Sequence, residues 1–151
     1  MYLRTHFIIA LFFGLLFMKF FENKIIFLFI VLISCFIPDI DTKFSKIGKK
    51  KIFRIFQLFF THRGVFHSFS FLILICIFLY FWKPFIAFGF LIGYGSHLIF
   101  DSFTKTGIYV FWPLKLKFHG FIKTGGKLEF LIFILFLIMD FLLIFYKIYM
   151  F

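Results

Sequence analysis

Long apolar stretches fill most of this 151-residue chain and leave few residues suited to contact with water. Hydrophobic residues make up 64% of the sequence and charged residues only 15%, and the mean hydropathy is +1.10. A soluble globular domain is usually about half apolar, so this composition excludes an ordinary cytosolic enzyme, a disordered tail and a secreted disulfide scaffold. The sequence predicts an all-α integral membrane protein that forms a single domain over residues 1–151.

Five apolar segments are expected to form its helices, at residues 7–21, 25–37, 65–82, 85–100 and 130–151. The first two are short, because 13 helical residues cover roughly 20 Å of a hydrocarbon layer about 30 Å thick. We expect them either to cross the membrane with a tilt or to form a re-entrant hairpin. Lys83-Pro84 predicts a tight turn between the third and fourth segments. Residues 51–60 have the pattern of a basic amphipathic helix lying on the membrane surface.

Positive charge predicts how the chain is oriented. The sequence has 17 Lys and Arg against 6 Asp and Glu, a net charge of +11. With five segments, the N-terminus and both long connections (38–64 and 101–129) share one side and carry thirteen basic residues, against four on the other. The positive-inside rule therefore places that side in the cytoplasm of a multi-pass protein of the cell (inner) membrane. The basic connections predict membrane lipids as partners, and no feature points directly to nucleic acid.

Polar, chemically reactive residues gather on this same side of the membrane. Four of the five histidines and four of the six acidic residues belong to the set, which consists of His6, Asp39, Asp41, His62, His67, His97, Asp101 and Glu129. Ionisable residues near a bilayer are costly and are usually functional. Their shared placement indicates one common site.

The residue types predict a metal site. Imidazole and carboxylate are ligands for zinc, manganese or iron. His97 and Asp101 are four residues apart and would share one face of a helix, while Asp39 and Asp41 would point the same way from an extended backbone. The candidate ligands are His6, Asp39, Asp41, His62, His67, His97 and Asp101. Three acids and four histidines exceed the needs of one ion, so two or more ions, with zinc favoured, are expected.

The order and spacing of these residues resemble the YdjM-type family of bacterial and archaeal inner-membrane proteins, described as LexA-binding or as membrane-bound metal-dependent hydrolases. The resemblance covers nearly the whole chain and is carried by Thr5-His6, Pro38-Asp39-Ile40-Asp41, His62-Arg63-Gly64 with His67-Ser68, Gly93-Tyr94, Ser96-His97, Asp101, Thr104, Gly107, Trp112-Pro113 and Gly125 to Glu129. It implies hydrolase activity. The HxxxD spacing and the His/Asp set are also similar, more distantly, to zinc-dependent phospholipase C.

The resemblance and the metal chemistry together predict a hydrolase acting at the cytoplasmic face. Bound metal would lower the pKa of a coordinated water toward 7, and the expected substrate is a phosphoester of a lipid or of a lipid-linked head group. Arg63 is a candidate to bind a phosphate oxygen. Glu129 is a candidate ligand, general base or acceptor for a ligand histidine.

Two other classes of protein remain open. A small metal-ion or proton transporter would need polar groups through the bilayer, and only Asp140 offers one. A non-catalytic membrane protein with a structural metal site would hold its ion in a closed coordination shell. We expect His119 to lie on the surface, and Cys35 and Cys76 to behave as small buried hydrophobic residues.

Overall fold

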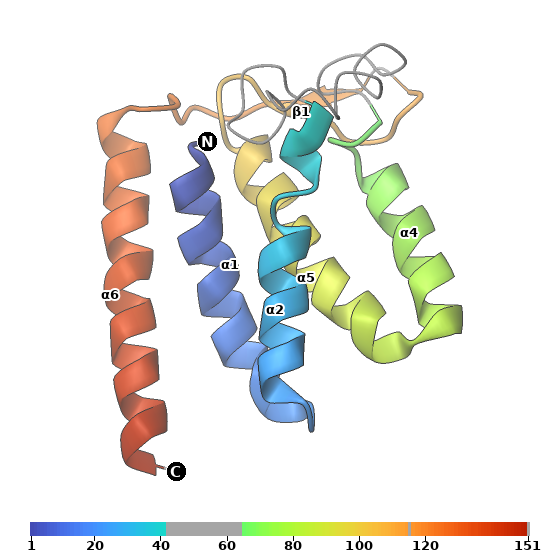
Figure 1. The fold of residues 1–151 in the computed structure, drawn as a ribbon. Helices are drawn as coiled ribbons and strands as arrows, with labels where there is room; N and C mark the ends of the chain where they lie inside the picture. Colours follow the sequence, from blue (N-terminus) through green and yellow to red (C-terminus); the bar gives the residue numbers. More distant parts are fainter. Residues whose placement is uncertain (42–64, 115, 151) are drawn as a thin grey trace.

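Five α-helices run up and down between the two ends of the molecule (Figure 1). The computed structural model describes residues 1–41, 65–114 and 116–150, and these helices lie within that part of the chain. They are α1 (Leu3–Phe17), α2 (Lys24–Ser34), α4 (Phe69–Trp82), α5 (Pro84–Ser102) and α6 (Lys127–Met150). The all-α membrane fold expected from the composition is confirmed.

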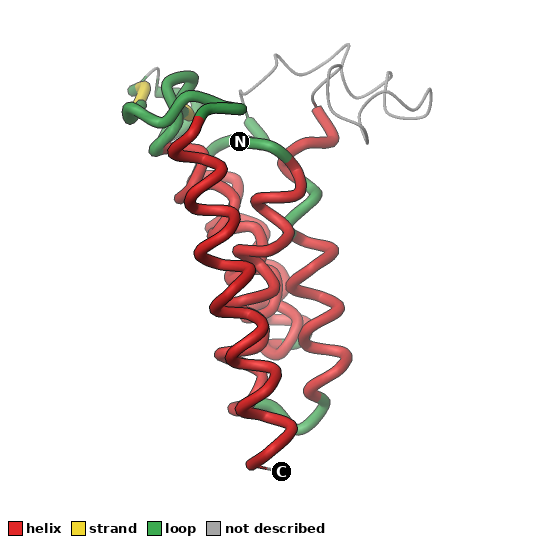
Figure 2. Tube along the Cα trace, turned by 90° about the vertical axis from the view of Figure 1, so that its left-hand side faces the viewer, coloured by secondary structure: helices red, strands yellow, loops and turns green. Residues whose placement is uncertain are grey.

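The N-terminus, the C-terminal ends of α2 and α5, and the first residues of α4 and α6 all lie at one end of the bundle, drawn at the top of Figure 1. The C-terminus lies at the other end, and the view turned by 90° shows the same arrangement (Figure 2). We call the end of the bundle that holds the N-terminus the upper end. The up-and-down order therefore brings together the chain positions that hold the polar set.

Helix α5 lies at the centre of the bundle and packs against α1, α2 and α4, while α6 packs mainly on α1. Small residues let α5 approach α2 closely: a methyl group added at Gly93 would overlap the carbonyl oxygen of Val31 and the hydroxyl of Ser34. On the other side of α5, Tyr94 and Leu98 pack with Leu72 of α4. The helix that carries HxxxD is thus held on three sides.

Within the described residues, three helical stretches are long and apolar enough to cross a membrane, namely Leu3–Phe20, Pro84–Ser102 and Lys127–Tyr149. The first combines α1 with a short 3₁₀ turn, Met18–Phe20. Helices α2 and α4 are apolar but shorter. Many large hydrophobic side chains on the outside of the bundle are exposed, most of all on α6, as expected of surfaces that face lipid.

Two helices begin away from their predicted positions, for local reasons. Helix α1 begins at Leu3, before the apolar run, and so includes His6. Helix α4 begins only at Phe69, because the Ser68 hydroxyl accepts a hydrogen bond from the Phe71 N–H and caps the helix. The turn predicted at Lys83-Pro84 is confirmed, with Pro84 opening α5.

One local expectation is wrong. Pro38–Asp41 forms a 3₁₀ turn and not an extended strand. The extended backbone from which Asp39 and Asp41 were expected to point the same way is therefore absent here, and the side chain of Asp41 lies outside the described residues. A two-stranded sheet, β1 (Ile108–Tyr109) with β2 (Lys117–Phe118), was also not predicted; it lies in the connection before α6. The predicted amphipathic helix at residues 51–60 lies outside the described residues.

Candidate metal centre

Five of the predicted ligands meet at the upper end of the bundle. His6 comes from the first turn of α1, and Asp39 comes from the 3₁₀ turn after α2. His67 lies in the segment before α4, and His97 and Asp101 lie in the last two turns of α5. The three imidazoles and Asp101 are 1% exposed, and Asp39 is half-buried. Four separate parts of the chain therefore converge on one buried polar cluster.

Asp101 stands at the middle of this cluster. Its Oδ1 atom lies 3.2 Å from His6 Nε2 and 2.5 Å from the Met1 ammonium nitrogen. Its Oδ2 atom faces the other two histidines, at 3.8 Å from His67 Nε2 and 3.9 Å from His97 Nε2. The predicted pairing of residues 97 and 101 on one helix face is thus confirmed, and the two carboxylate oxygens serve two different sets of imidazoles.

Asp39 completes the second set. Its Oδ1 atom lies 3.9 Å from His67 Nε2 and 4.0 Å from His97 Nε2. These separations are longer than a hydrogen bond. They suit two ligands on a shared ion, because atoms bonded to one zinc at about 2.0–2.2 Å lie at most roughly 4.4 Å apart.

In the part of the chain that the structure describes, two groups of three residues are placed so that they could hold a metal ion. One is His6, His97 and Asp101, and the other is Asp39, His67 and His97; in each, the ligand atoms lie within 4.8 Å of one another. Because His97 belongs to both groups, the two positions are adjacent. His97 offers only its Nε2 atom to both groups, so it can ligate one ion at a time, and the two-ion site expected from the number of ligands stays a prediction.

Hydrogen bonding prepares His97 to bind a cation. Its Nδ1 atom lies 2.9 Å from the Cys35 carbonyl oxygen, and since a carbonyl can only accept, Nδ1 carries the proton. The Nε2 lone pair then points into the cluster, where that buried atom has no hydrogen-bond partner among the described residues. The His6 ring stacks on the His97 ring with centroids 3.8 Å apart. A buried acceptor without a donor fits a metal ligand.

Burial also affects the carboxylate at the edge of the cluster. Removal from water raises the pKa of Asp39, and the neighbouring Asp101 carboxylate raises it further, whereas His6, His67 and the Met1 ammonium group oppose the shift. A proton therefore competes with a cation for the Asp39 carboxylate up to a higher pH than at an ordinary carboxylate. Binding of a cation by Asp39 would thus depend on pH.

The remaining predicted site residues have other positions. His62, Arg63 and the side chain of Asp41 lie outside the described part of the chain. Glu129 is buried but belongs to neither metal group. It accepts hydrogen bonds from the Tyr2 N–H (2.5 Å), the Thr5 hydroxyl (3.0 Å) and the Gly125 N–H (2.6 Å), and so ties the start of α6 to the start of α1.

Most of the residues set apart from the site in the sequence are also apart from it in the structure. His119 is exposed in the upper connection and Cys76 is partly buried. Cys35 is buried as expected, but its carbonyl oxygen contacts His97 of the cluster. Asp140 is buried in α6, and neither carboxylate oxygen has a hydrogen-bond partner among the described residues. It follows Lys127 by 13 residues, roughly 20 Å along the helix.

One functional contact could not be found from residue types. The Cys35 carbonyl orients His97, but a main-chain oxygen leaves no mark in the sequence. The role of Thr5 was similarly hidden: it lies beside His6, yet its hydroxyl points to Glu129. Because α1 packs between α5 and α6, the side chains of Thr5 and His6 point to different places, Thr5 toward Glu129 and His6 toward the metal cluster.

Parts of the chain are similar in sequence to known proteins. The chain is 32% identical over 103 residues to "Uncharacterized protein YvsG" of Bacillus subtilis (strain 168), which covers 64% of each chain. It is 31% identical over 110 residues to "Inner membrane protein YdjM" of Escherichia coli (strain K12), which covers 65% of this chain and 56% of that one. The chain thus matches less than two thirds of the length of these curated relatives.

No solved structure matches the chain, so its similarity to zinc-dependent phospholipase C stays a prediction. The family comparison reaches further along the sequence. The YdjM inner membrane protein family matches residues 1–150, a span that includes every residue of the polar cluster. With the membrane helices and this match together, the chain belongs to the YdjM inner membrane protein family.

Proposed function

We propose that this protein is a membrane-embedded, metal-dependent hydrolase that cleaves a phosphoester of a lipid or lipid-linked substrate. The observation that carries the proposal is the convergence of His6, His67, His97, Asp39 and Asp101 at one end of a helical bundle. Five ionisable side chains in such a place are expensive unless they have a function.

The cluster has the chemistry that divalent metals require. Its nitrogen and oxygen donors suit zinc, with manganese or iron as alternatives. Two ions are proposed from the number of ligands, with His97 bound to one of them. Such ions, when bound, supply a nucleophile at neutral pH and neutralise the charge of an anionic transition state. The hydrogen bond from His97 to the Cys35 carbonyl holds the imidazole tautomer that such binding needs.

Other residues have supporting roles in this proposal. Asp101 faces all three histidines and sets their spacing. Glu129 positions the first turn of α1, which carries His6, through its bonds to Tyr2 and Thr5. Arg63, which precedes the described segment containing His67, is proposed to bind a phosphate oxygen of the substrate.

The substrate class follows from the location proposed for the site. The cluster lies at the upper end of the bundle, and basic residues are concentrated in the connections on that side. We propose that this end faces the cytoplasm. Anionic lipid head groups would then be concentrated beside the cluster.

A structural metal site is the second candidate, and the burial of the cluster favours it. His6, His67, His97 and Asp101 are each only 1% exposed, so their ions could be fully enclosed. Such a protein would retain metal but hydrolyse nothing. The third candidate, a small ion transporter, depends on Asp140 as a second polar position deeper in the bundle.

The first experiment is elemental analysis of the detergent-purified protein. We expect one or more equivalents of zinc or manganese in the wild type, a loss of at least tenfold in the His97→Ala/Asp101→Ala variant, and no loss in His119→Ala. The last variant is a matched control, because it removes an exposed histidine outside the cluster. Absence of metal after repletion of folded protein contradicts the proposal.

Hydrolysis is then measured with the metal-loaded wild type. A phosphodiester probe and radiolabelled phospholipids in mixed micelles are the substrates, and the same double variant is the inactive control. Turnover that depends on both metal and the cluster supports the hydrolase. Stable metal without turnover of any of these substrates favours the structural site.

A further inference from the structure

A separate cavity of about 260 Å³ lies between the upper ends of α1 and α6. Its wall is formed by Tyr2, Arg4 and Thr5 from the start of α1 and by residues 125–127, 129, 130 and 133 around the start of α6. None of these residues belongs to either metal group. The cavity is smaller than the roughly 300–1,000 Å³ of sites that enclose a drug-sized ligand, so it fits a head group and not a whole lipid.

Two cationic side chains, Arg4 and Lys127, line this cavity. The Arg4 guanidinium carbon lies 5.3 Å from the ring centre of Tyr2 and 5.4 Å from that of Phe133, which fixes its position by cation–π contact. Within the described part of the chain, neither cation forms an ion pair. The planar donors of Arg4 therefore remain available for a doubly hydrogen-bonded phosphate.

The one acidic residue in the wall does not cancel this preference for an anion. Glu129 accepts hydrogen bonds at both oxygens, from Tyr2 and Thr5 at Oε1 and from Gly125 at Oε2. Both carboxylate oxygens of Glu129 are thereby engaged in hydrogen bonds with the protein itself. The two cations outnumber it and give the cavity a net positive charge.

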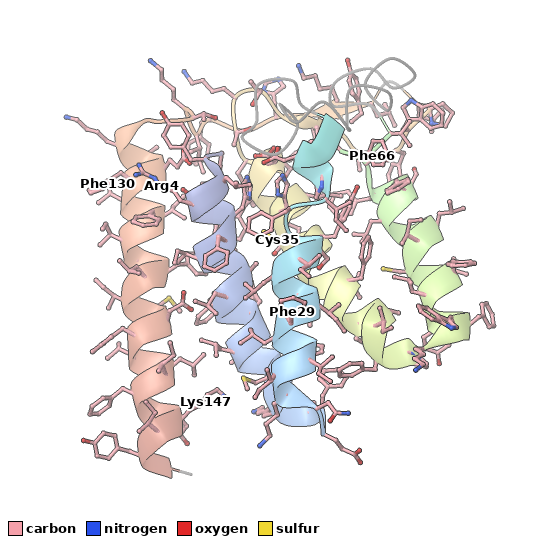
Figure 3. The ribbon with its side chains drawn as sticks, in the orientation of Figure 1. Arg4, Phe29, Cys35, Phe66, Phe130 and Lys147 are labelled. Atoms are coloured by element: carbon pink, nitrogen blue, oxygen red, sulfur yellow. The ribbon has the colours of Figure 1, made fainter. Side chains whose placement is uncertain are left out.

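The cavity also lies where a lipid head group would be found. Lys127 and Lys147 mark the two ends of the apolar part of α6, 20 residues and so about 30 Å apart, which is the thickness of the hydrocarbon layer. Arg4 and Phe130 lie together near the upper end (Figure 3). Below them, Leu131, Leu135 and Ile138 of α6 are more than half exposed, a surface suited to acyl chains.

We propose that this cavity binds the phosphate group of an anionic phospholipid, with the acyl chains lying along the exposed face of α6. The site is distinct from the metal centre and does not depend on the proposed hydrolysis. Charge complementarity, the size of the cavity and its position at the membrane boundary favour a lipid over a soluble phosphate.

The test is lipid titration of the purified full chain in detergent, followed by native mass spectrometry. Phosphatidylglycerol, phosphatidylcholine and inorganic phosphate are the three ligands. We expect phosphatidylglycerol to bind at least tenfold more tightly than either of the other two. The Arg4→Gln/Lys127→Gln variant should weaken phosphatidylglycerol binding at least tenfold.

A matched variant separates the cavity from the general basic surface. Lys105→Gln/Lys117→Gln removes the same charge from exposed residues of the upper connection, and it should change the affinity less than twofold. Arg4→Lys keeps the charge but loses the planar fork, so it should fall between the wild type and the double variant. A circular dichroism spectrum and a thermal unfolding midpoint unchanged from the wild type in every variant show that the bundle is folded.

Three outcomes overturn the proposal. Equal loss of binding in both double variants would show only nonspecific attraction to basic residues. Equal affinity for phosphatidylglycerol and phosphatidylcholine would show no anion selectivity. Equal affinity for inorganic phosphate would identify a soluble-phosphate site and not a lipid site. If the Arg4→Gln/Lys127→Gln variant does not fold, phosphatidylglycerol binding is measured with the single variants Arg4→Lys and Lys127→Gln. Wild-type affinity in both single variants contradicts the proposed lipid site.

Discussion

The Nδ1 atom of His97 lies 2.9 Å from the carbonyl oxygen of Cys35, so the last turn of α2 orients a candidate ligand on α5. This contact depends on how closely the two helices pack. Gly93, one turn before His97, allows that approach, since a methyl group there would overlap Val31 and Ser34. The position of His97 in the candidate metal centre thus depends on the contact of Gly93 with α2, and none of the candidate ligands takes part in that contact.

Gly93→Ala should therefore damage both stability and metal binding. We expect a loss of about 1–3 kcal/mol in the free energy of unfolding, typical of overpacking, and reduced metal content as α2 moves away from His97. Thermal unfolding in detergent and elemental analysis measure the two effects. Gly95→Ala is the matched control, because its nearest new contact, Leu72 Cδ2 at 3.6 Å, is an ordinary one. Equal behaviour of the two variants would contradict this account of the helix contact.

Glu129→Gln distinguishes a positioning role from a catalytic one. The substitution removes the negative charge that holds Tyr2, Thr5 and Gly125, so we expect a loss of about 1–3 kcal/mol in unfolding free energy. Any fall in hydrolysis should then be accompanied by lower stability. Complete loss of hydrolysis with unchanged thermal stability and metal content would instead identify Glu129 as a general base.

Metal should be released on acidification. Burial raises the pKa of Asp39, so a proton competes with the cation up to a higher pH than at an ordinary carboxylate, and imidazole ligands hold a metal only in their neutral form. Metal content measured after equilibration between pH 8 and pH 5 should fall toward the acid end and recover on return to pH 8. Circular dichroism at each pH separates release from unfolding. Metal content independent of pH across this range would argue against histidine ligands.

Asp140→Asn tests the transporter alternative. The Asp140 carboxyl is buried without a hydrogen-bond partner among the described residues. Asparagine leaves a polar group of similar size in the same place, so the free energy of unfolding should change by less than about 1 kcal/mol and the metal content should stay unchanged. The control is Asp101→Asn, which should lose metal. If Asp140→Asn also abolished metal uptake by reconstituted vesicles, the polar position in α6 would belong to an ion path.

The apolar segments and the positions of the charged residues determine much of the fold from the sequence alone. The lengths of the apolar segments predict five helices and the turn at Lys83-Pro84. The up-and-down order of these helices then places five of the predicted ligands at one end of the bundle, namely His6, Asp39, His67, His97 and Asp101. These are local or one-dimensional properties. A helix needs only its own hydrogen bonds, and successive membrane segments must alternate in direction.

Only the tertiary structure decided which side chains share a site. Thr5 and His6 are adjacent in the sequence, yet one faces Glu129 and the other Asp101, because α1 lies between α6 and α5. Asp39 faces the cluster from a 3₁₀ turn whose geometry the residue pattern did not reveal. The Cys35 carbonyl and the cavity at Arg4 were equally hidden. Such contacts depend on the distance between helices, which small residues such as Gly93 set through packing across the bundle.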